Sequence, residues 1–317
     1  LINICLFVSV FAAIWGYIQE IHGYFNFEWA WLRLDPVAMH LSFVMGHWRK
    51  FSIFTDPTTF AYNMAVSSVL CLAMLFGPLR FYKKAILFLM ILLFMTAMLF
   101  SGTRGGFVLV PACMLLLLVM CFNKKVFIFS SIAGVIFALI VISPTQSLLL
   151  KRFQTAFSPT NDASYAVRAQ NQAYIQPYIQ SHPIGGGLGS VGVWAVRFSP
   201  NSPLAKFPPD SGYVRVAVEL GYVGLLLFCA LIFTALYTGI NNYFLIRDPQ
   251  LRNYCLAMVL VVFAFNIGNF PQQAIVQFPS NILFYLAIAL INVLKRIDDQ
   301  QQLSAAAASN TNAINPV

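Results

Sequence analysis

Apolar runs long enough to cross a bilayer recur along the chain and are separated mostly by short polar connections. A membrane-spanning helix needs about 17–25 predominantly apolar residues. The runs predict spans near 1–19, 58–79, 85–101, 106–122, 126–143, 213–238, 254–270 and 279–294. One connection is much longer than the others, a Gly- and Pro-rich segment over 144–212. The pattern therefore predicts an all-α polytopic integral membrane protein with about eight transmembrane helices and one large loop.

Charge divides the short connections into two groups. Basic residues occupy alternate connections, namely Arg80, Lys83, Lys84, Lys124, Lys125, Arg247, Arg252, Lys295 and Arg296. Alternate connections lie on the same side of a membrane, and the positive-inside rule assigns this side to the cytoplasm. The connections over 20–57, 101–105, 144–212 and 271–278 then face outward.

The amino-acid composition agrees with a membrane protein and argues against a soluble globular protein. The chain is 59% hydrophobic and 9% charged, with a mean hydropathy of +0.75, which is more apolar surface than a soluble core absorbs. The net charge of +9 is partly topological and does not indicate nucleic-acid binding. The six cysteines lie in apolar runs and have no disulfide or metal-ligand spacing.

The two ends of the chain carry separate expectations. The chain opens at Leu1 inside an apolar run, and we take it as a fragment with further spans upstream. The polar, Ala-rich segment 300–317 is expected to be a disordered cytoplasmic tail after a transmembrane domain over 1–299.

Cations also occur on the outward side, where they are normally depleted. Arg104 lies in the short turn Ser101-Gly102-Thr103-Arg104-Gly105-Gly106. One interpretation is that its side chain snorkels to lipid headgroups. The other is an anion site, because the glycines let the backbone approach a ligand and the amides at the next helix start favour negative charge.

The long loop is basic. It carries five cations against two acids, a net charge of +3, from Lys151, Arg152, Arg168, Arg197 and Lys206 against Asp162 and Asp210. The apolar positions around Arg168 predict a short helix lying across the membrane surface, which ends near His182. A glycine cluster over 185–189 follows. Such a cluster can cradle phosphate, but it lacks the Lys-Ser/Thr of a P-loop, and a flexible turn is the alternative.

Charged residues also mark the start of the helix after the long loop. Asp210 precedes this helix, where Asp is a favoured cap, and a cap is one interpretation of the residue. Arg215 and Glu219 have i,i+4 spacing and could pair with each other. Because charge at the outer end of a span is costly, a role at a water-filled cavity is the other interpretation of these residues.

Four short motifs follow one another in a distinctive order along the chain. Phe54 to Ala61 reads Phe-Thr-Asp-Pro-Thr-Thr-Phe-Ala, and Ser101 to Gly106 reads Ser-Gly-Thr-Arg-Gly-Gly. Arg168 to Gly189 and Asp210 to Gly224 follow, the latter containing Glu-Leu-Gly-Tyr-Val-Gly. This order resembles the O-antigen ligase and O-antigen polymerase (Wzy-type) superfamily of bacterial membrane glycosyltransferases. The family's first motif has Asn at the position of Thr58.

The resemblance implies a GT-C-like, inverting glycosyltransferase that needs no metal or other cofactor. Its donor would be a glycan on polyprenyl pyrophosphate, and its acceptor would be a sugar hydroxyl. The implied catalytic residues are Asp210, as base or acceptor-orienting group, and Arg168 and Arg215, which would stabilise the pyrophosphate charge. The implied substrate-binding residues are Arg104, Ser101, Gly185, Gly187, Tyr213 and Glu219. The sequence shows no outward Asp-x-Asp or His-acid cluster of the kind that holds Mg²⁺.

The family contains polymerases and ligases, and one position separates them. Ligases carry a His-Asn-like pair at the head of the last motif, where this chain has Asp210-Ser211. This favours a polymerase for O-antigen, capsule or exopolysaccharide over a ligase that transfers to lipid A core. The implied location is the bacterial inner membrane, with the active site facing the periplasm. The implied partners are the lipid-linked donor, the glycan acceptor, the bilayer, a chain-length regulator and a flippase, without nucleic acid.

Two other classes stay open. A polytopic glycolipid transporter or flippase would show internal repeats and charges near the midplane. No repeat is visible, although 266–271 could be a helix break. A non-catalytic assembly partner would not need several cations on one face.

Overall fold

The computed structural model describes residues 1–317 apart from 45, 147–150, 152, 155–156, 158–162 and 315–317. Its helices are α1 (Ile2–His22), α2 (Asn26–Leu34), α3 (Pro36–Ser42), α4 (Pro57–Leu75), α5 (Phe81–Phe100), α6 (Arg104–Met120), α7 (Lys124–Ile142), α9 (Ala163–Ser181), α10 (Gly192–Phe198), α11 (Gly212–Leu245), α12 (Pro249–Gly268) and α13 (Ser280–Ile314). Strands β1 (Phe43–Val44) and β2 (His47–Trp48) form an antiparallel hairpin with Phe43 opposite Trp48.

The predicted spans are confirmed. Within the described residues, seven helices are long and apolar enough to cross a membrane, and α6 is a shorter apolar helix of 17 residues. These eight helices correspond one by one to the predicted runs. The chain is therefore an all-α polytopic membrane protein, as expected.

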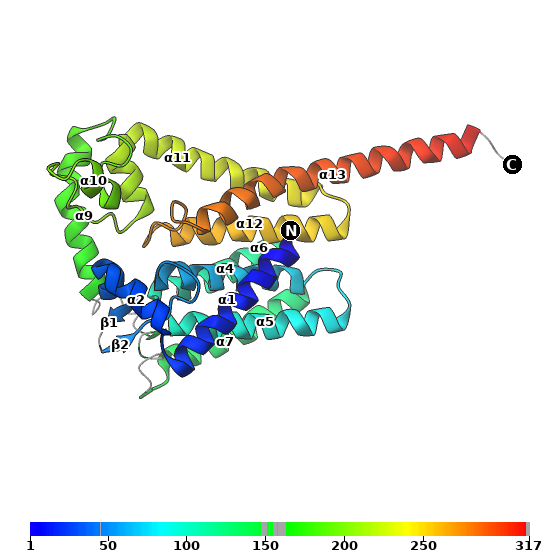
Figure 1. Ribbon diagram of the computed structural model, residues 1–317. Coiled ribbons are helices and arrows are strands. Elements are labelled where there is room, and N and C mark those ends of the chain that lie inside the picture. Colours follow the sequence, from blue (N-terminus) through cyan, green and yellow to red (C-terminus); the bar gives the residue numbers. More distant parts are fainter. Residues whose placement is uncertain (45, 147–150, 152, 155–156, 158–162, 315–317) are drawn as a thin grey trace.

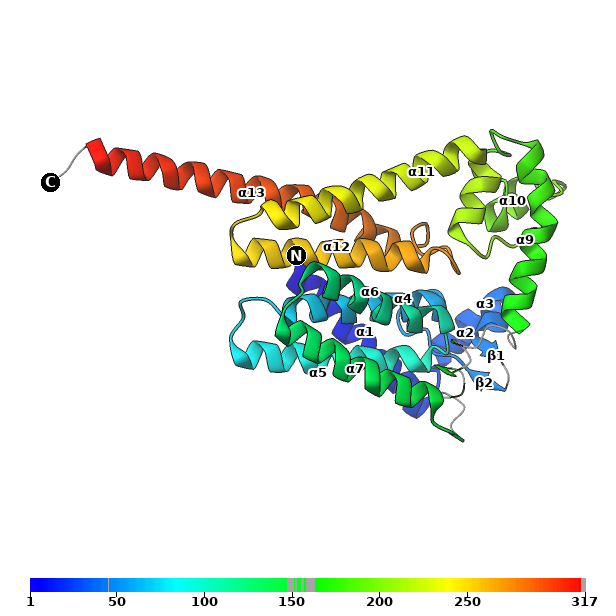
Figure 2. The same ribbon diagram turned by 180° about the vertical axis from the view of Figure 1, so that it is seen from behind.

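The long helices form a bundle, and the smaller elements gather at one end of it (Figures 1 and 2). We call this the outer end; it holds α2, α3, the hairpin, α9 and α10. Helix α9 runs across the outer end, transverse to the long helices, from the side of α2 to the side of α10. The connections 101–103 and 269–279 reach the same end, because successive helices reverse direction.

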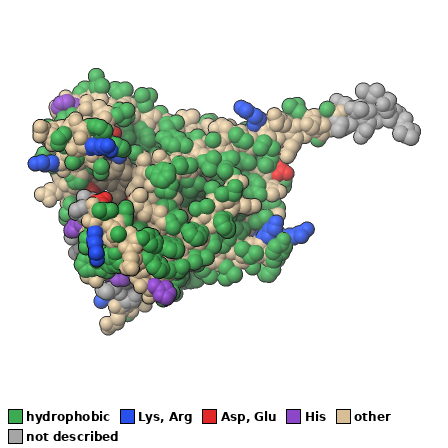
Figure 3. Space-filling view, in the orientation of Figure 1, with side chains coloured by type: hydrophobic (Ala, Val, Ile, Leu, Met, Phe, Trp, Pro, Cys, Tyr) green, Lys and Arg blue, Asp and Glu red, His purple; other side chains and the backbone are tan. Residues whose placement is uncertain are grey.

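The basic connections lie together at the opposite end, as their alternation predicted. Connections 76–80, 121–123 and 246–248 join helices at this inner end. Figure 3 shows Lys and Arg side chains at both ends of the molecule and mostly hydrophobic side chains between them. This is the distribution expected of a bundle that crosses a hydrocarbon layer.

Burial follows an order opposite to that of a water-soluble protein. The most hydropathic span, α7, is 6% buried, whereas α4 and α12, among the least hydropathic, are 89% and 67% buried. Lipid is as apolar as a leucine side chain, so the polar helices gain more from an interior position. Within α4, Asn63 donates through Nδ2 to the Thr59 carbonyl at 2.8 Å and to Ser280 Oγ at 3.1 Å.

The segment that was expected to be a disordered tail continues α13 instead. The helix extends to Ile314 and projects beyond the inner end of the bundle (Figure 1). The segment 300–308 is rich in Gln and Ala, which are strong helix formers, and residues 300–315 contain no Pro. Local propensity therefore favours continuation of the helix over an irregular tail.

Helix α11 is interrupted at Gly221, whose φ of 65° and ψ of −165° are not helical. Residues 222–245 that follow are long enough to cross the hydrocarbon, which needs about 20 residues. The turns before Gly221, which contain Arg215 and Glu219, thus extend beyond the length that the span requires.

A glycine turn over residues 183–189 packs against this interruption. The amides of Gly186 and Gly187 donate to the carbonyls of Val218 and Glu219, each at 2.8 Å. An interrupted helix leaves such carbonyls without their i+4 partners, and the turn supplies substitutes. A β-carbon on Gly185 would lie 2.6 Å from the Glu219 carbonyl oxygen, and one on Gly221 would overlap the Pro183 carbonyl. Glycine is therefore required on both sides of this contact.

Gly221→Ala is expected to lower the melting temperature of the purified protein in detergent. A side chain at this positive φ costs about 1–3 kcal/mol, and the clash with Pro183 adds to the cost. The matched control is Gly134→Ala in α7, where an added β-carbon meets nothing within 4 Å. We expect the control to melt at or above the wild-type temperature. Equal melting temperatures for the two variants would contradict the role given to Gly221.

Candidate functional site

One face of α9 is turned toward the start of α11. Arg168, Asn171 and Ile175 share this face, because they are spaced i, i+3 and i+7. Ile175 is 2% exposed and packs with Val191, Leu204, Phe207 and Val218. The predicted helix around Arg168 is thus confirmed, and its packing holds the Arg168 side of α9 toward the rest of the outer end.

Asp210 lies one residue before the cap of α11. The cap residue is Ser211, and Asp210 Oδ2 accepts a hydrogen bond from Asn171 Nδ2 at 2.8 Å. The interpretation of Asp210 as the helix cap is therefore not supported. Instead, the half-buried carboxylate is held from across the loop by α9.

Arg215 is fixed in orientation by two partners. Its Nε donates to Glu219 Oε1 at 3.1 Å, and its Nη1 donates to Gln273 Oε1 at 2.7 Å. The Arg215 side chain is 17% exposed and that of Glu219 is 7% exposed. The i,i+4 pair considered from the sequence is thus present. Because a buried pair of charges needs further hydrogen bonds to offset desolvation, the contact with Gln273 supports its geometry.

The connection over 269–279 joins segments that are far apart in the sequence. Gln273 Nε2 donates to the Pro209 carbonyl as well as binding Arg215. The Gly212 amide donates to the carbonyls of Asn269 and Gln272, at 3.0 and 3.1 Å. This connection therefore braces the segment around Asp210 and the first turn of α11 together. The sequence placed it outward but assigned no role to its glutamines.

The same connection reaches the first motif. Asp56 is the N-cap of α4 and accepts from the amides of Thr58 and Thr59, at 2.8 and 2.9 Å. Pro57 follows at the first helical position, where its missing N–H costs nothing. The Asp-Pro of the motif is thus a helix start. Gln277 Nε2 donates to Asp56 Oδ2, which ties this start to the 269–279 connection.

Ser101 is a structural residue of the outer turn between α5 and α6. It is fully buried; its Oγ donates to the Met98 carbonyl at 2.7 Å and accepts from the Thr103 amide at 3.1 Å. Arg49, from the first outer loop, donates through Nε to the Ser101 carbonyl and through Nη2 to Thr103 Oγ1, both at 2.7 Å. These bonds occupy Ser101, so its predicted contact with substrate is not supported.

Two further residues anchor the first outer loop. The Lys50 amide donates to the Phe100 carbonyl at 3.0 Å, and Lys50 Nζ pairs with Glu20 at 3.6 Å. Burial lowers the pKa of the Lys50 ammonium group, and the Glu20 carboxylate opposes this shift. Neither Arg49 nor Lys50 was singled out from the sequence, although both lie in an outward loop where cations are unusual.

Arg104 begins α6 and is half-buried beside Tyr62. A β-carbon on the neighbouring Gly105 would clash with the Tyr62 hydroxyl and would lie 3.4 Å from Pro271 Cγ. The Tyr62 side chain is 2% exposed, and its hydroxyl has no hydrogen-bond partner among the described residues. Tyr62 therefore lies next to the start of α6. Sequence reasoning missed it because Tyr62 lies inside a span.

The remaining predicted residues have packing roles. The Tyr213 hydroxyl donates to Asn266 Oδ1, and its ring lies 5.8 Å from that of Phe228. The amides of Gly185 and Gly187 donate to the carbonyls of His182 and Glu219, at 2.9 and 2.8 Å. The expectation that this turn cradles phosphate is therefore not supported, because these amides are already used inside the protein.

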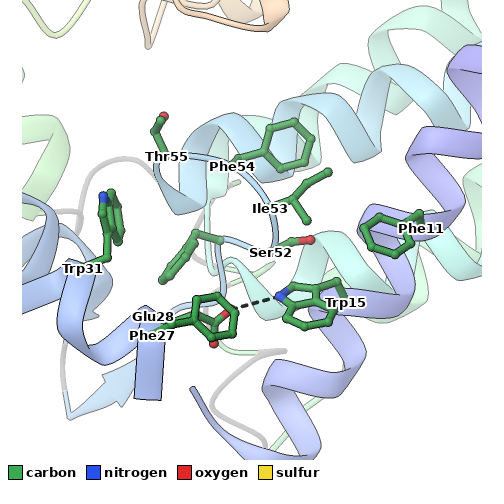
Figure 4. A pocket seen from close by; sticks show the side chains of 10 residues that line it. Phe11, Trp15, Phe27, Glu28, Trp31, Ser52, Ile53, Phe54 and Thr55 are labelled. Atoms are coloured by element: carbon green, nitrogen blue, oxygen red, sulfur yellow. Dashed lines mark hydrogen bonds between the residues drawn. The ribbon is translucent and has the colours of Figure 1, made fainter. Parts of the chain in front are cut away.

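An apolar cavity of about 440 Å³ opens beside the first motif. Its walls are mainly aromatic, from Phe11 and Trp15 of α1, Phe27 and Trp31 of α2, and Phe51 and Phe54 (Figure 4). Glu28 in its wall accepts from Trp15 Nε1 at 2.9 Å and from Gln19 Nε2 at 2.6 Å. With its carboxylate occupied in this way, the cavity suits an apolar ligand.

The described residues contain no group of three or more His, Cys, Asp or Glu side chains placed to hold a metal ion. The polar groups at the outer end are instead guanidinium, carboxylate, phenol and amide groups. Arg215 binds Gln273, and Gln273 binds the carbonyl of Pro209, next to Asp210, while Tyr62 lies against Gly105, next to Arg104. The arrangement can bind an anion and can accept a proton at the carboxylate.

The fold and this site define a polytopic α-helical membrane protein with a cationic site at its outer end. The family model described as O-antigen ligase matches residues 85–229. This part of the chain is therefore an O-antigen ligase family domain, consistent with the O-antigen ligase and polymerase superfamily, which confirms the resemblance seen in the motifs. All the site residues predicted from the sequence fall within it. No curated protein matches the chain significantly.

Proposed function

We propose that the protein is a membrane glycosyltransferase that extends a glycan carried on polyprenyl pyrophosphate. The family supports an O-antigen ligase or polymerase type of function with glycan and lipid-linked substrates. The observation that carries the proposal is the bracing of Asp210 and Arg215. Asn171 of α9 holds the carboxylate and Gln273 of the 269–279 connection holds the guanidinium. A site of this kind is preorganised before substrate binds.

The proposed reaction uses these groups as follows. An acceptor sugar hydroxyl attacks the anomeric carbon of the donor from the side opposite to the pyrophosphate. A bond from the hydroxyl oxygen to this carbon forms, the carbon–oxygen bond to the pyrophosphate breaks, and the anomeric configuration inverts. The hydroxyl proton passes to Asp210, and the bonding electrons leave with the polyprenyl pyrophosphate. Arg168, Arg215 and Arg104 stabilise the developing charge through planar guanidinium groups that match phosphate oxygens.

The buried Tyr62 hydroxyl supports a ligand at this site. A buried polar group without a partner is costly, and few occur in native proteins. The Tyr62 hydroxyl lies against Gly105, next to Arg104, and could donate to a phosphate oxygen held there. A transporter would need no carboxylate at an external loop, so the braced Asp210 favours an enzyme over a flippase.

Polymerisation is favoured over ligation by the residue at position 210. A carboxylate and a serine stand where ligases of the family carry a His-Asn-like pair. The test is incubation of the purified protein with a polyprenyl-pyrophosphate-linked repeat unit. We expect longer lipid-linked products from this substrate alone. Transfer only after addition of lipid A core would instead indicate a ligase, and no transfer to either acceptor would reject the enzyme.

The outer end is proposed to face the periplasm across the bacterial inner membrane, because the basic connections lie at the inner end. In a variant without native cysteines, Ser199→Cys is expected to react with a membrane-impermeant thiol reagent in intact spheroplasts. Ser304→Cys, on the exposed part of α13 at the inner end, is the control and should react only after lysis. The reverse pattern would overturn the orientation.

A further inference from the structure

A second cavity, of about 530 Å³, lies in the external loop beyond the site described above. We call it the α10 cavity. The side chains that matter for its chemistry are Tyr178, Ser190, Trp194, Phe198, Ser199 and Ser202. Its volume falls within the range of about 300–1,000 Å³ that is typical of small-molecule sites. None of the described residues that line it carries a charge.

Two aromatic rings contribute to the lining of this cavity. Trp194 and Phe198, one turn apart on α10, lie with their ring planes 9° apart and their centroids 6.0 Å apart. Trp194 is 51% exposed and Phe198 is 70% exposed, so their rings are accessible. Flat, amphipathic rings of this kind can cover the apolar C–H face of a sugar while its edges remain polar.

Hydroxyl groups also line the cavity. The Ser190 Oγ is buried and has no hydrogen-bond partner among the described residues. A β-carbon on Gly186 would lie 2.7 Å from the Tyr178 hydroxyl and 3.1 Å from Ser190 Oγ. Because glycine has no side chain, both hydroxyls can lie close to the backbone at this position. Ser199 and Ser202 add two more. Hydroxyls can both donate and accept, which matches the hydroxyls of a sugar better than a pyrophosphate or a metal ion.

The α10 cavity adjoins the segment that carries Asp210. Gly192, the first residue of α10, has a φ of 71°, and a β-carbon on it would lie 3.6 Å from Pro209 Cγ. The glycine turn lines the cavity through Gly186 and binds α11 through the carbonyls of Val218 and Glu219. The elements that form the cavity therefore also contact the residue before Asp210 and the first part of α11.

We infer that the α10 cavity is a binding site for a neutral segment of the glycan, one or a few sugar units from the reacting carbon. This inference rests on the proposed function for the identity of the ligand, but its chemistry is separate. The site would bind sugar without any phosphate and would contribute to affinity, not to the chemical step.

The probe is the oligosaccharide repeat unit released from the host's own lipid-linked intermediate and freed of phosphate. Saturation-transfer NMR with the purified protein should show transfer to sugar protons. Trp194→Ala should weaken binding about tenfold, which corresponds to about 1.4 kcal/mol, because the contact between the indole ring and the sugar is lost. Trp194→Phe keeps a ring and should retain most of the affinity. Val193→Ala is the matched control, since Val193 is 80% exposed on the same helix and does not line the cavity.

Two results would overturn the inference. One is the absence of saturation transfer from the wild-type protein to the sugar protons; the other is equal affinity of Trp194→Ala and wild type for the sugar. In the transfer assay, Trp194→Ala should raise the KM for the acceptor and leave kcat nearly unchanged. Arg168→Lys should still bind the phosphate-free sugar. If wild type binds this sugar through Trp194 but transfers nothing, the proposed function fails and the sugar site stands. If transfer occurs and Trp194 has no effect on binding, the sugar site alone fails.

Discussion

Arg168→Lys is expected to lower the rate of glycan transfer about a hundredfold, the usual effect of losing one contact to charge that develops in the transition state. Lysine keeps the positive charge but loses the planar fork that binds two phosphate oxygens. Arg168 lies on the braced face of α9, with Asn171 and Ile175, so its position is fixed before substrate binds. The measurement is the initial rate with purified protein at saturating donor and acceptor.

The matched control for Arg168 is Arg197→Lys. Arg197 is an exposed arginine of the same loop whose guanidinium lies 5.4 Å from the Phe198 ring. We expect this variant to transfer glycan at close to the wild-type rate. Arg104→Lys and Arg215→Lys should resemble Arg168→Lys. Wild-type rates for all three Lys variants would rule out bidentate binding of phosphate by these arginines. Their positive charge would then be the only property that transfer requires.

Asp210→Asn is expected to lower the rate by a factor of about 10²–10⁴, the range attributed to a positioned proton acceptor. An amide at this position can still accept from Asn171 through its oxygen, so the local fold should be preserved. The measurement is the initial rate of the variant relative to wild type, at saturating donor and acceptor.

A true helix cap provides the control for Asp210. Asp248 caps α12 at the inner end and accepts from the amides of Gln250 and Leu251, at 2.8 and 2.7 Å. Asp and Asn cap helices about equally well, so Asp248→Asn should be nearly silent in rate and melting temperature. If Asp210→Asn is equally silent at matched protein concentration, the carboxylate is not the proton acceptor.

The sequence was sufficient for the features that depend on local composition. A helix that crosses lipid needs a long apolar run, so all eight spans could be located from the sequence. The alternation of basic connections also grouped the inner connections correctly. The helix around Arg168 also has a local pattern. The expectation of a disordered tail over 300–317 differs from the structure, in which α13 extends to Ile314. That expectation gave the polar residues more weight than the helix propensity of the alanines. The Ala-rich stretch favours helix regardless of what it packs against.

The bracing contacts could not be predicted in this way. Gln277 and Asp56 are 221 residues apart, and Gln273 and Pro209 are 64 apart. A side-chain amide that bonds across such distances has no neighbours in the sequence that identify its partner. For the same reason Asp210 could not be separated from a helix cap. The preference for Asp before a helix is local, whereas its bond to Asn171 depends on how α9 is folded back.

The interruption at Gly221 has a mechanical consequence. In most membrane proteins an external domain ends where a span begins, and the joint is a loop. Here the joint lies within a helix: residues 212–220 are bonded to the glycine turn on one side and to the 269–279 connection on the other. Arg215 and Glu219 therefore move with the external layer, while residues 222–245 move with the bilayer. We expect a change in membrane thickness or tilt to be absorbed at Gly221, so that the spacing of Asp210 and Arg215 stays constant.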